Sequence, residues 1–225
     1  MTTEKQDCSS CIFCGNKRIQ ELKRLNYPVD HAIIFEDDKL IVTPDFVGLT
    51  LGHLLIIPKE HIHSFGASAP NLLLALKQQI NECRKLLNTE DLFIFEHGAV
   101  NVSEGGASID HAHMHVMPRP PEITEEYIDN FIADSKLVSS NKVSTCLEGL
   151  QTLFQESQSY IYYAFSVENG WYYKVGKLPH QFLRKMFQPI MGISYDWRTS
   201  QFSNQAKALF GDTISLIGKN TKVSL

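Results

Sequence analysis

The chain has 225 residues, with 21 basic and 25 acidic side chains and therefore a formal net charge of −4. Its content of 43% hydrophobic and 20% charged residues is typical of a globular protein and excludes whole-chain disorder or a fibrous structure. The acidic excess argues against a long nucleic acid as partner, because binding along a phosphate backbone requires surplus positive charge. No apolar run approaches the roughly 20 residues of a membrane span, and the polar N-terminus contains no signal-peptide core. We therefore expect no membrane association, and a location in the cytoplasm or, in a eukaryote, the nucleus.

Three of the cysteines lie close to the N-terminus, and their total of five is odd, which does not suggest a disulfide framework. Cys11 and Cys14 have the Cys-x-x-Cys spacing of half a zinc site, because two thiolates one turn apart can bind one tetrahedral ion. Cys8 is an alternate ligand. A redox pair, or two small apolar side chains, is the competing interpretation.

The first half of the chain predicts an antiparallel sheet with a helix packed on it. An Asp-Asp turn at residues 37–38 between two apolar runs is typical of a hairpin. From Ser68, taken as the N-cap, apolar residues recur at steps of three and four as far as Leu87, which indicates an amphipathic helix. The expected fold class is α+β, an antiparallel sheet with flanking helices. Its first strands are predicted at residues 32–36, 40–43, 54–57 and 92–95.

The composition changes after Pro121, where a polar and charge-rich stretch begins. A hairpin is predicted at residues 160–175, and an amphipathic helix from Pro179 to Gly192. We therefore expect a small C-terminal α+β extension. The predicted divisions are a first domain at residues 1–121, a connecting segment at 122–158 and a C-terminal region at 159–225.

His111, His113 and His115 alternate with apolar residues in a segment that predicts a strand. Alternate residues of a strand share one face, so three imidazoles would stand in a row with spacings of about 6.5–7 Å. Three histidines on one face are hard to explain as packing. A three-histidine metal site would need a bulge to bring the outer rings together. A second interpretation has one imidazole attack phosphorus while its neighbours bind oxygens and a metal.

This segment resembles the His-φ-His-φ-His-φ-φ signature of the histidine triad (HIT) superfamily of nucleotide hydrolases and transferases. Further matches follow in the family's order: Cys11-Ile-Phe-Cys14, and residues 35–38, 52–62 and 105–108. Together they cover roughly residues 8–120, and their shared order makes the resemblance specific.

The resemblance implies a structural zinc ion. In family members with an N-terminal cysteine pair, the ion is completed by the histidine of the Pro-Lys-x-His segment and by the first histidine of the triad. The implied ligands are Cys11, Cys14, His61 and His111, a set that completes the half-site suggested by the cysteine spacing.

The resemblance also implies catalytic roles. His113 would be the nucleophile that forms a nucleotidyl-imidazole intermediate, and His115 would hold phosphate oxygens. Ser108 would contact the α-phosphate or the leaving group, while Gly105 and Gly106 would allow close approach of the backbone to phosphate.

The nucleoside is expected to contact residues upstream of these. Asp45 falls where relatives bind the ribose hydroxyls and Phe46 where they form the base pocket, although a plain turn aspartate competes. Asn101 matches the polar residue before the phosphate loop, with a turn asparagine as its alternative. His53 is expected to support the fold or the pocket, and residues 96–98 receive no role.

The predicted hairpin at residues 160–167, the stretch at 178–187 and the segment Asp196-Trp-Arg198 resemble the C-terminal region of CwfJ-type proteins. The predicted function is a nucleotide hydrolase or nucleotidyltransferase that acts at an α-phosphate through a nucleotidyl-histidine, with a nucleotide or nucleoside-phosphate conjugate as ligand. The alternative is a non-catalytic scaffold of RNA processing that binds a nucleotide or RNA end; the complete triad favours the enzyme. Small family members are commonly homodimers, but residues 150–225 could cover the surface that a second subunit covers, so we favour a monomer over a homodimer.

Overall fold

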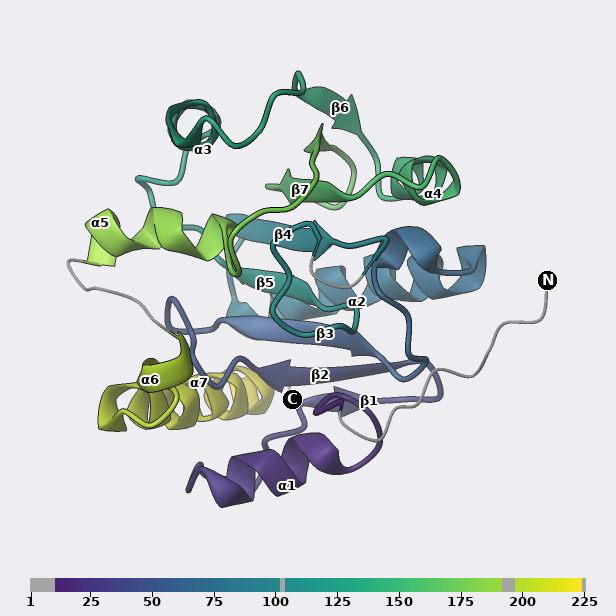
Figure 1. Ribbon diagram of the computed structural model, residues 1–225. Coiled ribbons are helices and arrows are strands. Elements are labelled where there is room, and N and C mark those ends of the chain that lie inside the picture. The colour runs from purple at the N-terminus through teal and green to yellow at the C-terminus, as the bar shows by residue number, and fades with distance from the viewer. Residues whose placement is uncertain (1–10, 102–103, 192–196, 224–225) are drawn as a thin grey trace.

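The computed structural model of this chain describes residues 11–101, 104–191 and 197–223. Eight strands within these residues form one antiparallel sheet, which confirms the α+β class. The strands are β1 (Phe35–Glu36), β2 (Leu40–Pro44), β3 (Leu54–Pro58), β4 (Leu92–Gly98), β5 (Met114–Pro118), β6 (Val143–Thr145), β7 (Tyr160–Ala164) and β8 (Gly170–Lys174). Their order across the sheet is β1-β2-β3-β5-β4-β7-β8-β6 (Figure 1).

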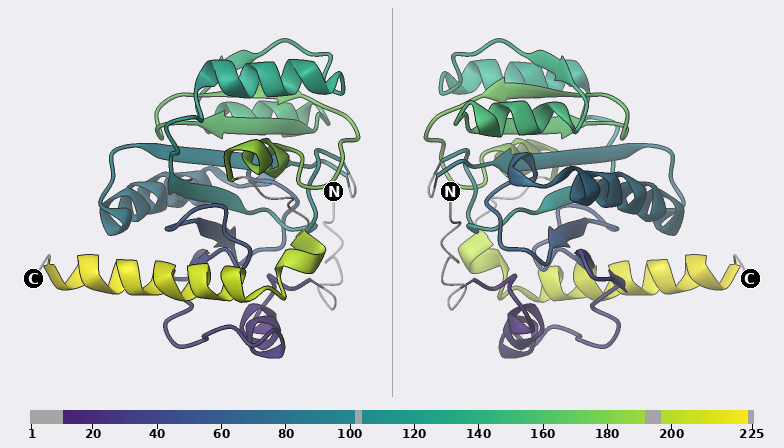
Figure 2. Two further views of the ribbon diagram at one scale, coloured as in Figure 1. Left: turned by 90° about the vertical axis from the view of Figure 1, so that its left-hand side faces the viewer. Right: turned by 90° about the vertical axis from the view of Figure 1, so that its right-hand side faces the viewer.

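Helices lie on both faces of this sheet and beyond its edges. Those in the described residues are α1 (Lys17–Arg24), α2 (Pro70–Leu87), α3 (Glu125–Ser135), α4 (Gly149–Gln155), α5 (Phe187–Met191), α6 (Trp197–Ser200) and α7 (Asn204–Val223), with the short 3₁₀ helices η2 (Phe65–Ala67) and η3 (Leu183–Met186). Helices α1 and α7 lie near the β1–β2 edge, whereas α3 and α4 lie near the opposite edge (Figures 1 and 2). In the part of the chain that the structure describes, no helix is both long and apolar enough to cross a membrane.

Strand β4 shows how the central strands of the sheet are buried on both faces. Every one of its residues is buried, and successive side chains enter two different cores. Leu92 and Ile94 pack with α2 on one face, here called the α2 face. Phe93 and Phe95 pack with residues of α1, α3 and η3 on the other, here called the pocket face.

Two predicted helix boundaries are wrong. Ser68 is not the N-cap of α2, because its hydroxyl donates to Phe65 O and Pro70 starts the helix at a position where its missing N–H costs nothing. The helix predicted from Pro179 begins only at Leu183, as η3 followed by α5. Gln181 has a φ of +59°, and its N–H donates to Gly106 O, so residues before Leu183 are held against a loop and cannot form a helical turn.

The histidine segment also differs from the prediction. Strand β5 begins at Met114, so only His115 of the three lies within it. Ala112 N–H donates to Ile62 O at 2.6 Å, and His111 O accepts from His113 Nδ1. The backbone before Met114 therefore bonds to a loop and to a side chain instead of to a strand.

The sheet continues past the predicted boundary at Pro121. Strand β7 pairs with β4 over five residue pairs, from Ile94↔Ala164 to Gly98↔Tyr160, and β7 and β8 form the predicted hairpin. A Cβ atom on Gly98 would lie 2.1 Å from the Tyr160 ring, so this pairing requires glycine there. The division of the chain into three parts stays a prediction.

Candidate active site and metal centre

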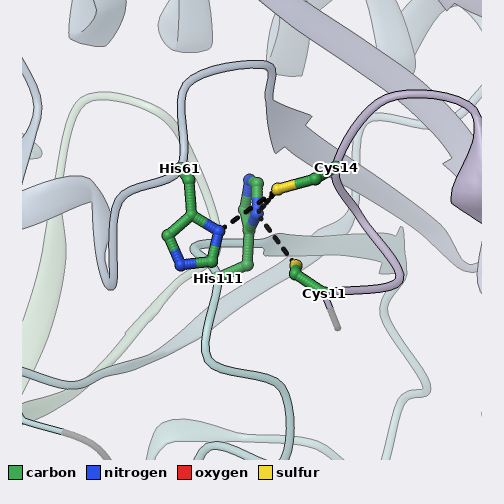
Figure 3. Close-up of side chains that lie close together, drawn as sticks. All are labelled: Cys11, Cys14, His61 and His111. Atoms are coloured by element: carbon green, nitrogen blue, oxygen red, sulfur yellow. Dashed lines mark hydrogen bonds between the residues drawn. The ribbon is translucent and has the colours of Figure 1, made fainter. Parts of the chain in front are cut away.

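Four side chains from three separate segments converge beside the triad (Figure 3). Cys11 Sγ lies 3.3 Å from His111 Nδ1, while Cys14 Sγ lies 3.2 Å from His61 Nδ1 and 3.6 Å from His111 Nδ1. All four donor atoms lie within 4.8 Å of one another. These are the four residues that the resemblance implied, and Cys8 lies outside the described residues.

The donor set fits zinc. Tetrahedral coordination with Zn–S bonds of about 2.3 Å and Zn–N bonds of about 2.0–2.1 Å separates sulfur from nitrogen by roughly 3.6 Å, close to the contacts found here. His111 Nε2 lies 2.7 Å from Pro58 O, which can only accept, so the proton sits on Nε2 and Nδ1 presents its lone pair to the sulfurs. Burial lowers the pKa of His111 to about 4, which keeps the ring neutral as a metal ligand must be.

A small pocket of about 30 Å³ opens next to this cluster on the pocket face of the sheet. Six of the residues predicted from the sequence line it: Asp45, Phe46, Gly106, Ser108, His113 and His115. Asn101 does not line it; this residue is exposed and lies near Glu104. Gly105 does not line it either, although its φ of +64° shapes the loop that Gly106 continues.

His113 is held in one orientation at the pocket wall. Its Nδ1 lies 2.8 Å from His111 O, so Nδ1 carries the proton and donates, leaving a lone pair on Nε2. The Phe13 ring packs against the His113 ring in a T-shaped arrangement, with ring centroids 5.3 Å apart. Burial lowers the pKa of His113, so the neutral, nucleophilic form is favoured.

A chain of hydrogen bonds determines the tautomer of His115. Leu49 N–H donates to His53 Nδ1 at 3.0 Å, so His53 carries its proton on Nε2. His53 Nε2 lies 3.0 Å from His115 Nδ1 and donates to it, which leaves His115 with an Nε2–H. The His115 ring stacks on the Phe95 ring, with ring centroids 4.1 Å apart and an angle of 5° between the ring planes. His115 is therefore a fixed hydrogen-bond donor, and His53 has the supporting position expected of it.

Asp45 is bonded differently from the expectation for a ribose-binding residue. Its Oδ1 accepts from Val47 N–H at 2.9 Å, and its Oδ2 accepts from the Arg184 guanidinium. Burial opposes ionisation, but Arg184 and its other neighbours outweigh that effect and hold the pKa of Asp45 well below its usual range. The structure thus gives this carboxylate a partner within the chain.

Sequence reasoning assigned no role to Arg184, Gln181 or His97, although all three line the pocket. Leu183 N–H donates to His97 Nε2 at 3.0 Å, which ties β4 to η3. No local pattern could have found Arg184, because its partner Asp45 lies 139 positions earlier in the chain.

Ser108 has a hydroxyl suited to a ligand. Its Oγ is buried and has no hydrogen-bond partner among the described residues. Because a buried polar atom without a partner costs free energy, a hydroxyl aimed at a pocket in this state is positioned to bond a ligand.

Comparisons with known proteins agree with these observations. A family model described as the HIT domain matches residues 27–122. An uncharacterized HIT-like protein of Borreliella burgdorferi is 31% identical over 120 residues, which are 48% of this chain and 75% of that protein. The protein named hit of Bacillus subtilis is 27% identical over 115 residues, 49% of this chain and 71% of that protein. A solved HIT family hydrolase from Clostridium thermocellum is 24% identical, with a TM-score of 0.39, over 52% of this chain and 96% of that one.

Proposed function

This chain belongs to the histidine triad (HIT) family, and from that premise we propose that it is a nucleotide hydrolase or nucleotidyltransferase that acts at an α-phosphate. The observation that carries this proposal is the orientation of His113. Its Nδ1–H is bound by the His111 carbonyl, and its Nε2 lone pair remains available at a pocket wall.

In the proposed reaction, His113 Nε2 attacks the α-phosphorus, and a P–N bond forms as the bond to the leaving group breaks with its electron pair. The product is a nucleotidyl-histidine. Water, or another acceptor hydroxyl, then attacks the same phosphorus and releases its proton to solvent. The P–N bond breaks, and its electron pair returns to His113 Nε2. Nothing is oxidised or reduced, and the ring recovers its starting tautomer.

Two neighbours are suited to stabilise the charge that develops on the phosphate. His115 Nε2–H and the Ser108 hydroxyl are donors at the same pocket; the His115 ring is held by His53 before a ligand arrives, and the Ser108 hydroxyl has no competing partner among the described residues. Donors positioned in advance stabilise a transition state more effectively than mobile ones. The contacts of Asp45 and Phe46 with the nucleoside, and of Asn101 and Gly105 with the phosphate loop, stay predictions.

We propose zinc as the ion held by Cys11, Cys14, His61 and His111, in a structural role. When bound, it would link the N-terminal segment to the residue that begins the triad. Phe13 lies between the two cysteines and contacts His113, so the bound ion would also hold Phe13 in place at the wall of the pocket.

The test is a substrate screen followed by trapping of the intermediate. Dinucleoside polyphosphates, nucleoside phosphoramidates, aminoacyl-adenylates and nucleotide sugars are offered to the wild type, His113→Ala and His31→Asn. His31 is an exposed histidine with a φ of +60°, a conformation that asparagine tolerates, so His31→Asn is the matched control.

We expect turnover to fall by about 10³-fold or more in His113→Ala and to be unchanged in the control. With a nucleotide labelled at the α-phosphate, label that is stable to base and released by acid should be found on the wild-type protein and be absent from His113→Ala, because protonation of the histidine nitrogen promotes cleavage of the P–N bond. Equal turnover in the two proteins on the best substrate would exclude the proposed mechanism.

The second candidate is a binding scaffold, for which the specific observation is the long C-terminal part beyond the family match. Its resemblance to the CwfJ type stays a prediction. Nucleotide binding without turnover of any offered class, and unaffected by loss of the His113 ring, would favour the scaffold.

A further inference from the structure

The pocket is assembled from two parts of the chain that lie far apart in sequence. Asp45, His113 and His115 come from the residues that match the family model, whereas Gln181 and Arg184 come from a segment about 60 residues beyond its end. The pocket is therefore incomplete without the C-terminal part.

That C-terminal segment is fastened to the loop of the phosphate-binding motif. Gln181 N–H donates to Gly106 O at 2.7 Å, and His180 Nδ1 donates to Ala107 O at 2.8 Å. A Cβ atom on Gly106 would lie 3.1 Å from Pro179 O, so the two backbones are in close contact. These contacts present the Arg184 side chain to the pocket from a defined backbone position.

Arg184 sets the charge balance of the pocket. Among the described residues that line it, Asp45 is the one carboxylate and Arg184 is the one permanent cation. Both are 5% exposed, and Arg184 donates to Asp45 Oδ2 and to Val47 O. The His53–His115 pair is a hydrogen bond between neutral rings and adds no positive charge. Without Arg184, the buried Asp45 carboxylate would lose its ion-pair partner and keep only the weaker influence of the buried Arg18, and it would face any phosphate placed beside His113. Like charges repel strongly in a site with little water.

We propose that Arg184 is a specificity-determining residue, which cancels the charge of Asp45 so that the pocket accepts a phosphate-bearing anion. The C-terminal segment is thereby a part of the substrate site, and the unpartnered Ser108 hydroxyl is a donor for the same anion. The identification of that anion as a nucleotide substrate rests on the proposed function; the selection of anions does not.

The test measures binding of inorganic pyrophosphate and of adenosine, which carries no phosphate, to the full-length protein by calorimetry. The variants are Arg184→Gln, Arg184→Lys and the double variant Asp45→Asn/Arg184→Gln. Lys185→Gln is the control, because Lys185 is the exposed neighbour of Arg184.

We expect Arg184→Gln to weaken pyrophosphate binding at least 10-fold while adenosine binding changes less than 3-fold. Arg184→Lys and the control should remain close to the wild type. The double variant should regain most of the lost affinity, because it leaves no unpaired carboxylate in the pocket. Since it also removes the buried unpaired charge, it provides a folded comparison should Arg184→Gln unfold.

Three outcomes would overturn the proposal: unchanged pyrophosphate binding in folded Arg184→Gln, equal losses for pyrophosphate and adenosine, or no recovery in the double variant. The first two would mean that Arg184 affects no anion or only the shape of the pocket. Arg184-dependent pyrophosphate binding in a protein that turns over no nucleotide would instead contradict the proposed reaction and support the present inference.

Discussion

The two faces of the central sheet bury carboxyl groups in different ways. On the pocket face, Asp45 is paired with Arg184, and its pKa is held well below the usual range. On the α2 face, Glu96 accepts from Phe65 N–H at 2.7 Å and from the Tyr160 hydroxyl at 2.6 Å, and no lysine or arginine of the described chain forms an ion pair with it. Burial raises the pKa of Glu96 to about 7.

This difference shows what a buried carboxyl group needs in order to stay charged. Neutral hydrogen-bond donors alone do not repay the loss of hydration, whereas a guanidinium with matched geometry does. The pocket face therefore keeps fixed charges beside its proposed nucleophile. The α2 face favours a neutral carboxyl group that serves packing, and we expect the two faces to respond differently to substitution and to pH.

The largest effect is expected from removal of the cysteine ligands at the pocket face. Cys11→Ser/Cys14→Ser should abolish zinc binding and lower the free energy of unfolding by several kcal/mol, because binding of a structural zinc contributes roughly 10 kcal/mol or more to folded zinc-finger peptides. Metal analysis of protein purified without added zinc, together with denaturant unfolding, measures both.

Cys146→Ser is the matched control, since Cys146 is exposed and lies outside the cluster. Zinc retained at full occupancy in the double variant, or zinc absent from the wild type, would contradict the ligand set.

A smaller effect, confined to the α2 face, is expected from Glu96. Its pKa is raised from 4.5 to about 7 in the folded protein, so folding favours the protonated form. The contribution of Glu96 to the free energy of unfolding is therefore greatest below pH 4.5, decreases as the pH rises from 4.5 to 7, and is constant above pH 7. The difference between these two pKa values corresponds to about 3 kcal/mol in the free energy of unfolding.

Glu96→Gln should remove this decrease, so that the stability difference between variant and wild type grows in favour of the variant from pH 4.5 to 7. Urea unfolding across that range measures it, with the exposed Glu168→Gln as control. A difference that does not vary with pH would show that Glu96 stays ionised, and the contrast between the two faces would fail.

The smallest effect is expected on the oligomeric state. Both faces of the sheet depend on β4, and the edge of β4 that could pair with a second chain is already paired with β7. We expect light scattering to give the mass of one chain for the wild type. Gly98→Val should disturb the pairing, because any Cβ atom there would meet the Tyr160 ring, and the freed strand edge should promote association. A wild-type mass of two chains would refute the expectation that residues 150–225 cover the surface that a second subunit covers in small family members.

Much of the fold follows from local patterns. The sequence alone determined most of the strands, the extent of α2 within two residues at its start, and the β7–β8 hairpin, because side-chain periods of 2 and 3.6 and turn residues act over neighbouring positions. The cysteine spacing suggested half a metal site, and the resemblance to the HIT family named the other ligands that the structure brings together.

What the sequence could not determine depends on contacts between distant residues. The strand after His113 starts late because Ala112 bonds to Ile62, and the helix predicted at Pro179 starts late because Gln181 bonds to Gly106. Likewise, the sequence predicts a turn or a ribose-binding role for Asp45, whereas in the structure Asp45 is paired with Arg184. Only the tertiary structure decided these points, because hydrogen bonds and ion pairs depend on which residues are close in space. The partners here lie between 50 and 139 positions apart along the chain.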